Sequence, residues 1–325
     1  MKYGIIGTSW ISSSFIEGAK KLCGAEIAAV YSRTNESGGA FAQKHSIPLV
    51  YTDLDEFAKG DFEAVYIASP NLLHCEHSLK MISAGKHVIC EKPLAASPEE
   101  IIACQKKAKE LGLIYTEAIM YMHSPQRDVL RNALPMLGNI SSAHFDFSQL
   151  SSKYEAYKRG ETPNIFNPAL ATGCLNDLGV YCVYPAVDLF GMPKSIKADA
   201  VFLRTGADGS GNASLNYGDK LVTLTYSKTG QDYAGSFIYG DEGTIEIESI
   251  SKLINADFIA KDGSKTELCP YIEKDEIMGY EAREFEEFIS SQGGEKYSLC
   301  SEMSLAVGKV METIRNISKT EGSYA

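Results

Sequence analysis

The feature that most constrains the fold is an alternation of two hydrophobic periodicities over residues 1–120. Short β-rich runs are separated by helix-like stretches such as Asn71–Ala84, in which apolar residues recur every three or four positions. Another helix is predicted to begin at Ser97 and Pro98, a typical capping pair. Strands joined by helical crossovers pair in parallel. The pattern predicts a doubly wound parallel sheet with strands at Lys2–Gly7, Glu26–Tyr31, Ala64–Ser69, His87–Cys90 and Leu113–Thr116.

The second half of the chain has a different character. Alternating apolar and polar runs follow one another with glycine-rich turns and no helices between them, which indicates an antiparallel sheet. Two amphipathic helices close the chain, one containing Met278 and Phe285 and the other Val310 and Ile314. We expect an α/β domain over residues 1–120 and an α+β domain over residues 121–325, with strands of the second at Ile196–Leu203, Leu221–Tyr226, Ser236–Tyr239 and Thr244–Glu248.

Charge and composition exclude several classes of protein. The 325 residues include 31 basic and 42 acidic side chains, a net charge of −11, so no overall field attracts nucleic acid or an anionic membrane. No apolar run approaches the about 18 residues that span a bilayer, and the N-terminal residues lack a signal-peptide pattern. The eight cysteines contain no Cys-x-x-Cys pair, which favours reduced thiols in a cytoplasmic protein over disulfides or a zinc site.

The turn after the first predicted strand is a candidate phosphate-binding turn. Gly7, Thr8, Ser9, Trp10 and Ile11 lie where a dinucleotide-binding (Rossmann) domain directs its backbone N–H groups at a pyrophosphate. The usual spacing would place glycine at positions 7, 9 and 12, and only the first is present. The small serines at 9 and 12 still permit close backbone approach. An ordinary strand–turn–helix junction is the alternative.

The end of the second predicted strand bears on the choice of cofactor. NAD-specific sites usually carry an acidic residue here to accept the ribose hydroxyls, and none occurs between Ile27 and Thr34. Ser32, Arg33 and Thr34 instead offer a guanidinium and two hydroxyls, which suit a 2′-phosphate. The residues therefore favour NADP(H) over NAD(H), the alternative being a solvated arginine at a strand end.

Two further motifs follow predicted strands and indicate a family. Ser69–His74 reads SPNLLH, and Glu91–Leu94 reads EKPL. Together with Glu117–Ala118, Gly173–Tyr181 and Gly240–Ile247, in this order along the chain, they resemble the Gfo/Idh/MocA family of oxidoreductases. The resemblance covers essentially the whole chain, and the incomplete glycine turn is its main departure from the family pattern.

The resemblance is strongest to one branch of that family. Many sugar and inositol dehydrogenases have histidine where this chain has Tyr181. Tyrosine at this position, with Glu117 and the segment Asn164–Pro168, is more similar to dimeric dihydrodiol dehydrogenase and the NADP-dependent xylose dehydrogenases. This implies hydride transfer between the nicotinamide and a hydroxyl or carbonyl carbon of a sugar-like or diol substrate. It also implies a homodimer, or a dimer of dimers, formed through the second-domain strands.

The resemblance also implies which residues form the site. Those expected near the cofactor, besides the phosphate turn and residues 32–34, are Ser69, Pro70, Asn71, His74, Glu91 and Lys92. A lysine beside the reacting oxygen stabilises its developing negative charge and lowers the pKa of a neighbouring phenol. We therefore expect Lys92 to act electrostatically and Tyr181 to transfer the proton.

Asp177 is expected to bind a substrate hydroxyl or to pair with Lys92, since it lies four residues before Tyr181 on one helix face. Tyr184 is the reserve candidate for the acid, and Tyr121 and His123 are candidates for the pocket wall. Purely structural roles for these side chains are the alternative. At the level of the whole protein, the alternatives are a catalytically silent ligand sensor on the same fold and a reductase for a non-sugar substrate that resembles biliverdin reductase.

Overall fold

The computed structural model describes residues 1–321 and divides the chain into two compact units. The first unit contains Met1–His123 and Glu273–Leu305, and the second contains Ser124–Ile272 and residues 306–321. The sequence analysis placed residues 273–305 in the second domain, whereas the structure packs them in the first unit. Glycine at position 18 permits this close packing, because a Cβ there would lie only 2.5 Å from the backbone nitrogen of Gly279 and would collide with it.

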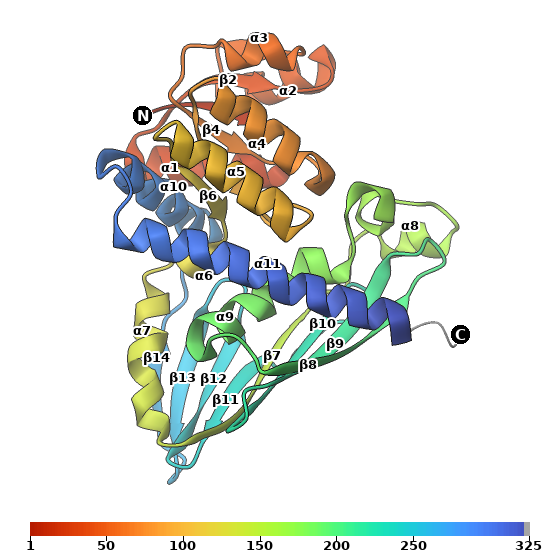
Figure 1. Cartoon of the computed structure of the whole chain (residues 1–325), viewed down its shortest axis with the longest axis vertical. Coiled ribbons are helices and arrows are strands. Elements are labelled where there is room, and N and C mark those ends of the chain that lie inside the picture. The colour runs from red at the N-terminus through yellow and green to blue at the C-terminus, as the bar shows by residue number, and fades with distance from the viewer. Residues whose placement is uncertain (322–325) are drawn as a thin grey trace. The chain divides into compact units, whose positions relative to one another are not determined.

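The first unit is built on a six-stranded parallel sheet, as the periodicity predicts (Figure 1). Its strand order, β3-β2-β1-β4-β5-β6, is that of a dinucleotide-binding domain. The central strands are buried on both faces and rich in β-branched and aromatic residues. The strands are β1 (Lys2–Ile6), β2 (Glu26–Tyr31), β3 (Leu49–Tyr51), β4 (Ala64–Ile67), β5 (His87–Glu91) and β6 (Tyr115–Ala118).

Helices of the first unit connect these strands, and α10 packs beside α1. The predicted cap is present, since the Ser97 hydroxyl accepts a hydrogen bond of 3.3 Å from the backbone N–H of Glu100. The helices are α1 (Trp10–Cys23), α2 (Asn35–His45), α3 (Leu54–Ala58), η1 (Asn71–Leu73), α4 (His74–Ser83), α5 (Pro98–Glu110), α6 (Met120–His123) and α10 (Lys274–Ser290), together with the first part of α11 (Glu295–Glu321).

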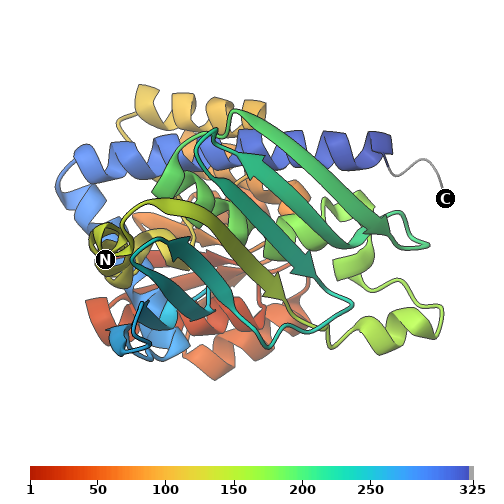
Figure 2. The same cartoon turned by 90° about the horizontal axis from the view of Figure 1, so that it is seen from below.

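The second unit is built on an eight-stranded sheet, visible in Figure 2. All neighbouring strands are antiparallel except the pair β7 and β10, so the predicted mostly antiparallel sheet is confirmed. In the order of the sheet the strands are β14 (Lys265–Cys269), β13 (Ile254–Ala260), β12 (Gly243–Ser249), β11 (Ser236–Gly240), β7 (Ile140–Ser148), β10 (Leu221–Ser227), β9 (Asp208–Asn216) and β8 (Ser195–Phe202).

One face of this sheet is covered and alternate residues on the other face are exposed. In β10, Val222 and Leu224 are fully buried, whereas Leu221 is 50% exposed. The helical segments of this unit are α7 (Gln126–Ala133), η2 (Leu134–Leu137), α8 (Tyr154–Lys158), η3 (Asn164–Phe166), η4 (Pro168–Leu170), the π-helical turn η5 (Leu175–Gly179), α9 (Val180–Phe190) and the rest of α11. No helix in residues 1–321 has both the length and the apolar character needed to cross a membrane.

Candidate active site

The turn between β1 and α1 lies where a dinucleotide-binding domain holds its phosphates. From β1 the chain builds the sheet outward through β2 and β3 on one side and then through β4, β5 and β6 on the other. The strand order therefore reverses at β1, and ligands bind at such a switch point. Gly7 has a φ of +105°, and a Cβ there would overlap the carbonyl oxygen of Ala68. The one glycine present is therefore the one that the backbone requires.

The N-terminus of α1 is suited to binding an anion because no side chain caps it. Ser9 is the N-cap residue, but its side chain makes no cap hydrogen bond and its Oγ lies 3.5 Å from Oγ of Ser12. The first N–H groups of the helix thus lack a side-chain acceptor, and the helix dipole favours negative charge at this end. Ser12 is fully buried, so only a small side chain fits there.

The Ser32–Thr34 segment presents one cation beside this turn. The Ser32 hydroxyl lies 2.6 Å from that of Ser37, and Thr34 Oγ1 accepts from the backbone N–H of Ser37 as the cap of α2. These hydroxyls therefore order the start of α2, whereas Arg33 is exposed. The structure gives the two hydroxyls a capping role that the sequence analysis did not anticipate.

Lys92 follows β5 directly and is joined to Pro93 by a cis peptide bond. The carboxylate of Glu91 is buried, where it accepts a 2.6 Å hydrogen bond from the Tyr66 hydroxyl and one of 3.3 Å from the backbone N–H of Lys92. Burial raises the pKa of Glu91, against the opposing charge of Lys92 and the Tyr66 hydrogen bond. Glu91 therefore holds the backbone that carries Lys92, with its own side chain directed into the domain.

His74 joins the two loops that carry the family motifs. Its Nδ1 lies 2.8 Å from the carbonyl oxygen of Pro93 and its Nε2 lies 2.9 Å from that of Ser69. The side chain is buried, and burial lowers the pKa of His74 to about 4, so the ring is neutral at neutral pH and donates its one N–H to one of the two carbonyl oxygens while packing against the other. His74 therefore fixes the loop after β4 against the loop after β5, where the predicted residues Pro70 and Asn71 also lie.

The second unit carries Asp177 and Tyr181 at the start of α9. Asp177 lies in η5, a π-helical turn of the kind often found at functional sites. The Asp208 carboxylate accepts a 2.6 Å hydrogen bond from the backbone N–H of Leu175 and so holds the beginning of this turn. Tyr181 is 8% exposed, and its ring packs edge-on against Phe147 with centroids 5.4 Å apart.

Asp177 forms an ion pair with Lys228, which no sequence pattern had indicated. The Lys228 residue is only 5% exposed and directly follows β10, so its charge needs a partner in the protein. Its position directly after an alternating apolar strand marks Lys228 as unusual in the sequence but does not identify Asp177 as its partner. Tyr184, the reserve acid, is fully buried one turn further along α9.

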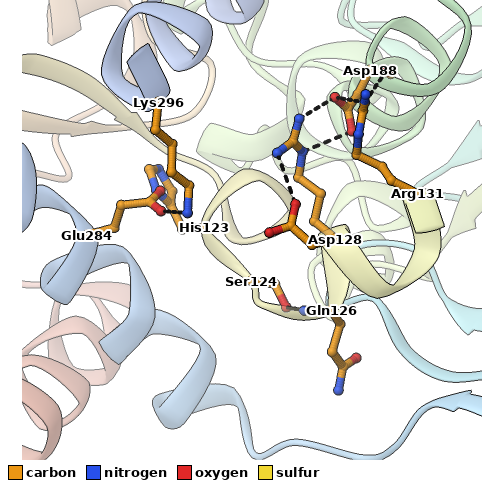
Figure 3. Close-up of polar contacts among 9 residues, drawn as sticks. His123, Ser124, Gln126, Asp128, Arg131, Asp188, Glu284 and Lys296 are labelled. Carbon is orange, nitrogen blue, oxygen red and sulfur yellow. Dashed lines mark hydrogen bonds and ion pairs between the residues drawn. The ribbon is translucent and has the colours of Figure 1, made fainter. Parts of the chain in front are cut away.

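Two residues suggested for the pocket wall lie in the interior of the first unit. Tyr121 is fully buried. Nδ1 of His123 lies 2.5 Å from the Glu284 carboxylate (Figure 3), and its Nε2 lies 2.8 Å from the Glu117 carbonyl oxygen. Burial raises the pKa of Glu284, but hydrogen bonds and charge from His123 and Lys296 outweigh it, so the net shift is downward. Cys300 completes a group of three potential metal ligands, fewer than a structural zinc site requires.

Comparison with known proteins gives the family. The model described as "Oxidoreductase family, NAD-binding Rossmann fold" matches residues 1–119, and "GFO/IDH/MocA C-terminal domain" matches residues 135–246. A scyllo-inositol 2-dehydrogenase (NADP(+)), IolU of Bacillus subtilis, is 38% identical over 316 residues, covering 97% of this chain and 96% of that protein. The chain belongs to the GFO/IDH/MocA family. The fold and the family predicted from the motifs are thereby confirmed.

Another relative agrees with the predicted branch, and two solved structures agree with the predicted fold. Human trans-1,2-dihydrobenzene-1,2-diol dehydrogenase is 30% identical over 255 residues, covering 76% of this chain and 74% of that protein. A levoglucosan dehydrogenase solved with NADH and levoglucosan has a TM-score of 0.87 at 17% identity, with 99% and 98% of the two chains covered. The 3-ketoreductase KijD10 of Actinomadura kijaniata, solved with NADP, has a TM-score of 0.85 at 21% identity, covering 97% of each chain. The two structures support the fold alone.

Proposed function

We propose that the protein is an NADP(H)-dependent oxidoreductase of sugar-like or diol substrates. It would interconvert a secondary hydroxyl and a ketone, or a cyclic hemiacetal and its lactone. The observation that carries the proposal is that the chain has Lys92 fixed at the end of β5 in the first unit and, in the second unit, Asp177 in η5 followed by Tyr181 in α9. A sensor without catalytic activity would not need all three of these residues.

The residues of the first unit fit a dinucleotide. The N-terminus of α1 lacks a side-chain cap, Gly7 permits the tight turn, and Arg33 is exposed at the end of β2. We infer that the phosphate turn holds the pyrophosphate and that the loops after β4 and β5 line the nicotinamide. When bound, the nicotinamide supplies the hydride donor or acceptor.

The chemistry of the protein side chains follows from their charge and setting. The Lys92 ammonium stabilises negative charge on the substrate oxygen, which is worth most where water is excluded. The Tyr181 hydroxyl gives its proton to that oxygen in reduction and takes it back in oxidation. Asp177, paired with the ammonium of Lys228, accepts a hydrogen bond from a neighbouring substrate hydroxyl and so orients the substrate.

The functional test is a substrate panel of inositols, aldoses and trans-diols with each cofactor, followed through the absorbance of the reduced nicotinamide. Turnover of a polyol, an aldose or a diol supports the proposal. NADPH binding without turnover across the panel supports the sensor instead. Reduction of a linear tetrapyrrole, with no activity on hydroxylated substrates, supports the biliverdin reductase-like alternative.

Cofactor choice gives a separate prediction. Arg33→Ala should weaken NADPH binding by about 1–3 kcal/mol, the range for losing a contact to a charged group, and leave NADH binding nearly unchanged. Lys59→Ala, which removes an exposed cation at the C-terminal end of α3 that pairs with Glu56, is the matched control and should change neither affinity. Titration with both cofactors measures this. Equal affinity of the wild type for NADH and NADPH would contradict the proposed preference.

We also propose that the exposed face of the second sheet forms a homodimer or a dimer of dimers. Apolar side chains lie on this face, among them Val201 at 64%, Leu221 at 50% and Tyr239 at 39% exposed, more than a sheet facing only water would carry. Light scattering at micromolar concentration should give at least twice the mass of the chain, and a monomer would contradict the proposal.

The eight free cysteines are compatible with the cytoplasmic location that we propose.

A further inference from the structure

A lysine from a distant part of the sequence lies against the candidate phosphate turn. Nζ of Lys274, the first residue of α10, is 3.7 Å from the ring centroid of Trp10, the first residue of α1. Trp10 is 66% exposed directly after the turn, and Lys274 is half-buried. An ammonium this close to an indole face is attracted to it by the ring quadrupole, which fixes the position of the charge.

The packing of α10 on α1 accounts for this position. Lys274 lies over Trp10 at the start of α1, and Gly279 faces Gly18 further along. At the end of α1, Cys23 lines one pocket with Arg283 of α10, so residue numbers rise together along the two helices. The helices therefore run in the same direction, and the N-terminus of α10 lies at the same end of the pair as the N-terminus of α1. Figure 1 shows α1 and α10 side by side in the first unit.

The phosphate turn has no positive side chain of its own. Residues 7–13 read GTSWISS, and the first basic residue along α1 is Lys20 at its C-terminal end. Backbone N–H groups alone would face the two pyrophosphate charges, with serine at two of the three customary glycine positions. In a chain with a net charge of −11, a local cation would strengthen the binding of a polyanion by the backbone N–H groups of this turn.

Lys274 interacts electrostatically with two buried acidic side chains, Glu281 and Glu91. Glu281 of α10 is 1% exposed, its Oε2 has no hydrogen-bond partner within residues 1–321, and Glu91 is buried at the end of β5. Burial raises the pKa of Glu281, as does the charge of Glu91, while the charge of Lys274 lowers the pKa of both carboxylates. Lys274 therefore has acidic electrostatic partners within the first unit as well as the Trp10 ring.

We propose that Lys274 is a cofactor-binding residue whose ammonium, placed over Trp10, supplies the positive charge for the pyrophosphate that the turn itself lacks. This rests on the proposed NAD(P)-dependent function. It predicts that Lys274 serves NADH and NADPH alike, because both share the pyrophosphate, whereas Arg33 serves NADPH alone.

The protein offers an internal probe for this experiment. Trp10 is the only tryptophan in the sequence, so selectively excited tryptophan emission reports on the phosphate turn. Titration of the full chain with NADPH and with NADH should quench this emission. Calorimetric titrations give the dissociation constants without relying on Trp10, whose environment changes when Lys274 is replaced.

Lys274→Met should raise Kd for both cofactors roughly 10- to 100-fold, the fold-change for losing one contact to a charged group, and should flatten the salt dependence of binding. Lys274→Arg should retain most of the affinity. Lys21→Met, which removes an exposed lysine from the same helix pair, should leave Kd within about twofold, since rim charges contribute little. Should Lys274→Met fold poorly, Lys274→Gln makes the same test.

The outcomes separate this inference from the proposed function. If the wild type binds neither cofactor, both proposals fail. If it binds them and the neutral variants bind equally well, the function stands and the role of Lys274 is wrong. A lower melting temperature with unchanged Kd would show that Lys274 serves only as the counter-ion of Glu91 and Glu281, and would also overturn the inference.

Discussion

Tyr181→Phe is expected to lower turnover by roughly 10²–10⁴-fold, the usual contribution of general acid–base catalysis. The substitution removes only a hydroxyl, and the ring can still pack edge-on against Phe147, so the fold should persist. NADPH affinity should change little. Steady-state rates with an active substrate, measured beside the cofactor Kd, test this.

Lys92→Ala should cost a comparable or larger factor, because an uncompensated oxyanion in a water-poor site is costly. Residues that act on the same oxygen are not additive, so the double variant should lose far less than the product of the two single losses. Additive losses would show that the two side chains act independently.

Tyr184→Phe is the matched control for Tyr181→Phe. Both tyrosines lie in α9 and each change removes one hydroxyl, but Tyr184 is 0% exposed. Turnover should therefore survive Tyr184→Phe. If Tyr181→Phe keeps near-wild-type turnover and Tyr184→Phe does not, the assignment of the acid is reversed.

The architecture could be predicted from the sequence wherever burial imposes a clear period. β2 (Glu26–Tyr31) has the predicted bounds. α4 lies within the predicted helix Asn71–Ala84, and α5 begins at Pro98, as predicted. Strands without such a period were not predicted. β3 has only three residues, and β9 is a run of small and polar residues, DGSGNASLN, with little intrinsic strand preference.

The candidate site was predictable only where a motif fixed it. Lys92 and the phosphate turn follow strands whose carboxyl ends lie at one edge of a parallel sheet, so their placement follows from topology. Lys228 and Lys274 were not predicted, because each meets its partner through tertiary packing across more than 50 residues. No local pattern encodes such a contact.

A buried ion pair in the second unit is expected to have the largest effect on stability. Asp188 accepts two hydrogen bonds from Arg127, of 2.9 Å at Oδ2 and 2.5 Å at Oδ1, and both side chains are nearly inaccessible. Arg131 adds a bond of 2.8 Å to Oδ1, as Figure 3 shows. Asp188 lies on α9 and Arg127 on α7, so the pair joins two helices, one of which carries Tyr181.

Asp188→Ala should destabilise the protein by about 3–5 kcal/mol, because it leaves the Arg127 guanidinium buried without its counter-charge. The exposed carboxylate of Asp128, 3.7 Å from Arg127, is too solvated to replace it. Urea unfolding measures the change as a lower midpoint of the affected transition. Arg131→Ala is the control and should cost much less, since the Arg131 side chain is 44% exposed.

The double variant Arg127→Met/Asp188→Leu separates the energy of the ion pair from the penalty of an unpaired charge. Apolar side chains of similar volume leave no buried charge, and such replacements are often neutral or stabilising. We therefore expect the double variant to unfold at a higher urea concentration than Asp188→Ala. If it is less stable than Asp188→Ala, the hydrogen-bonded geometry itself holds α9 to α7, and turnover should then fall with stability because Tyr181 lies on the same helix.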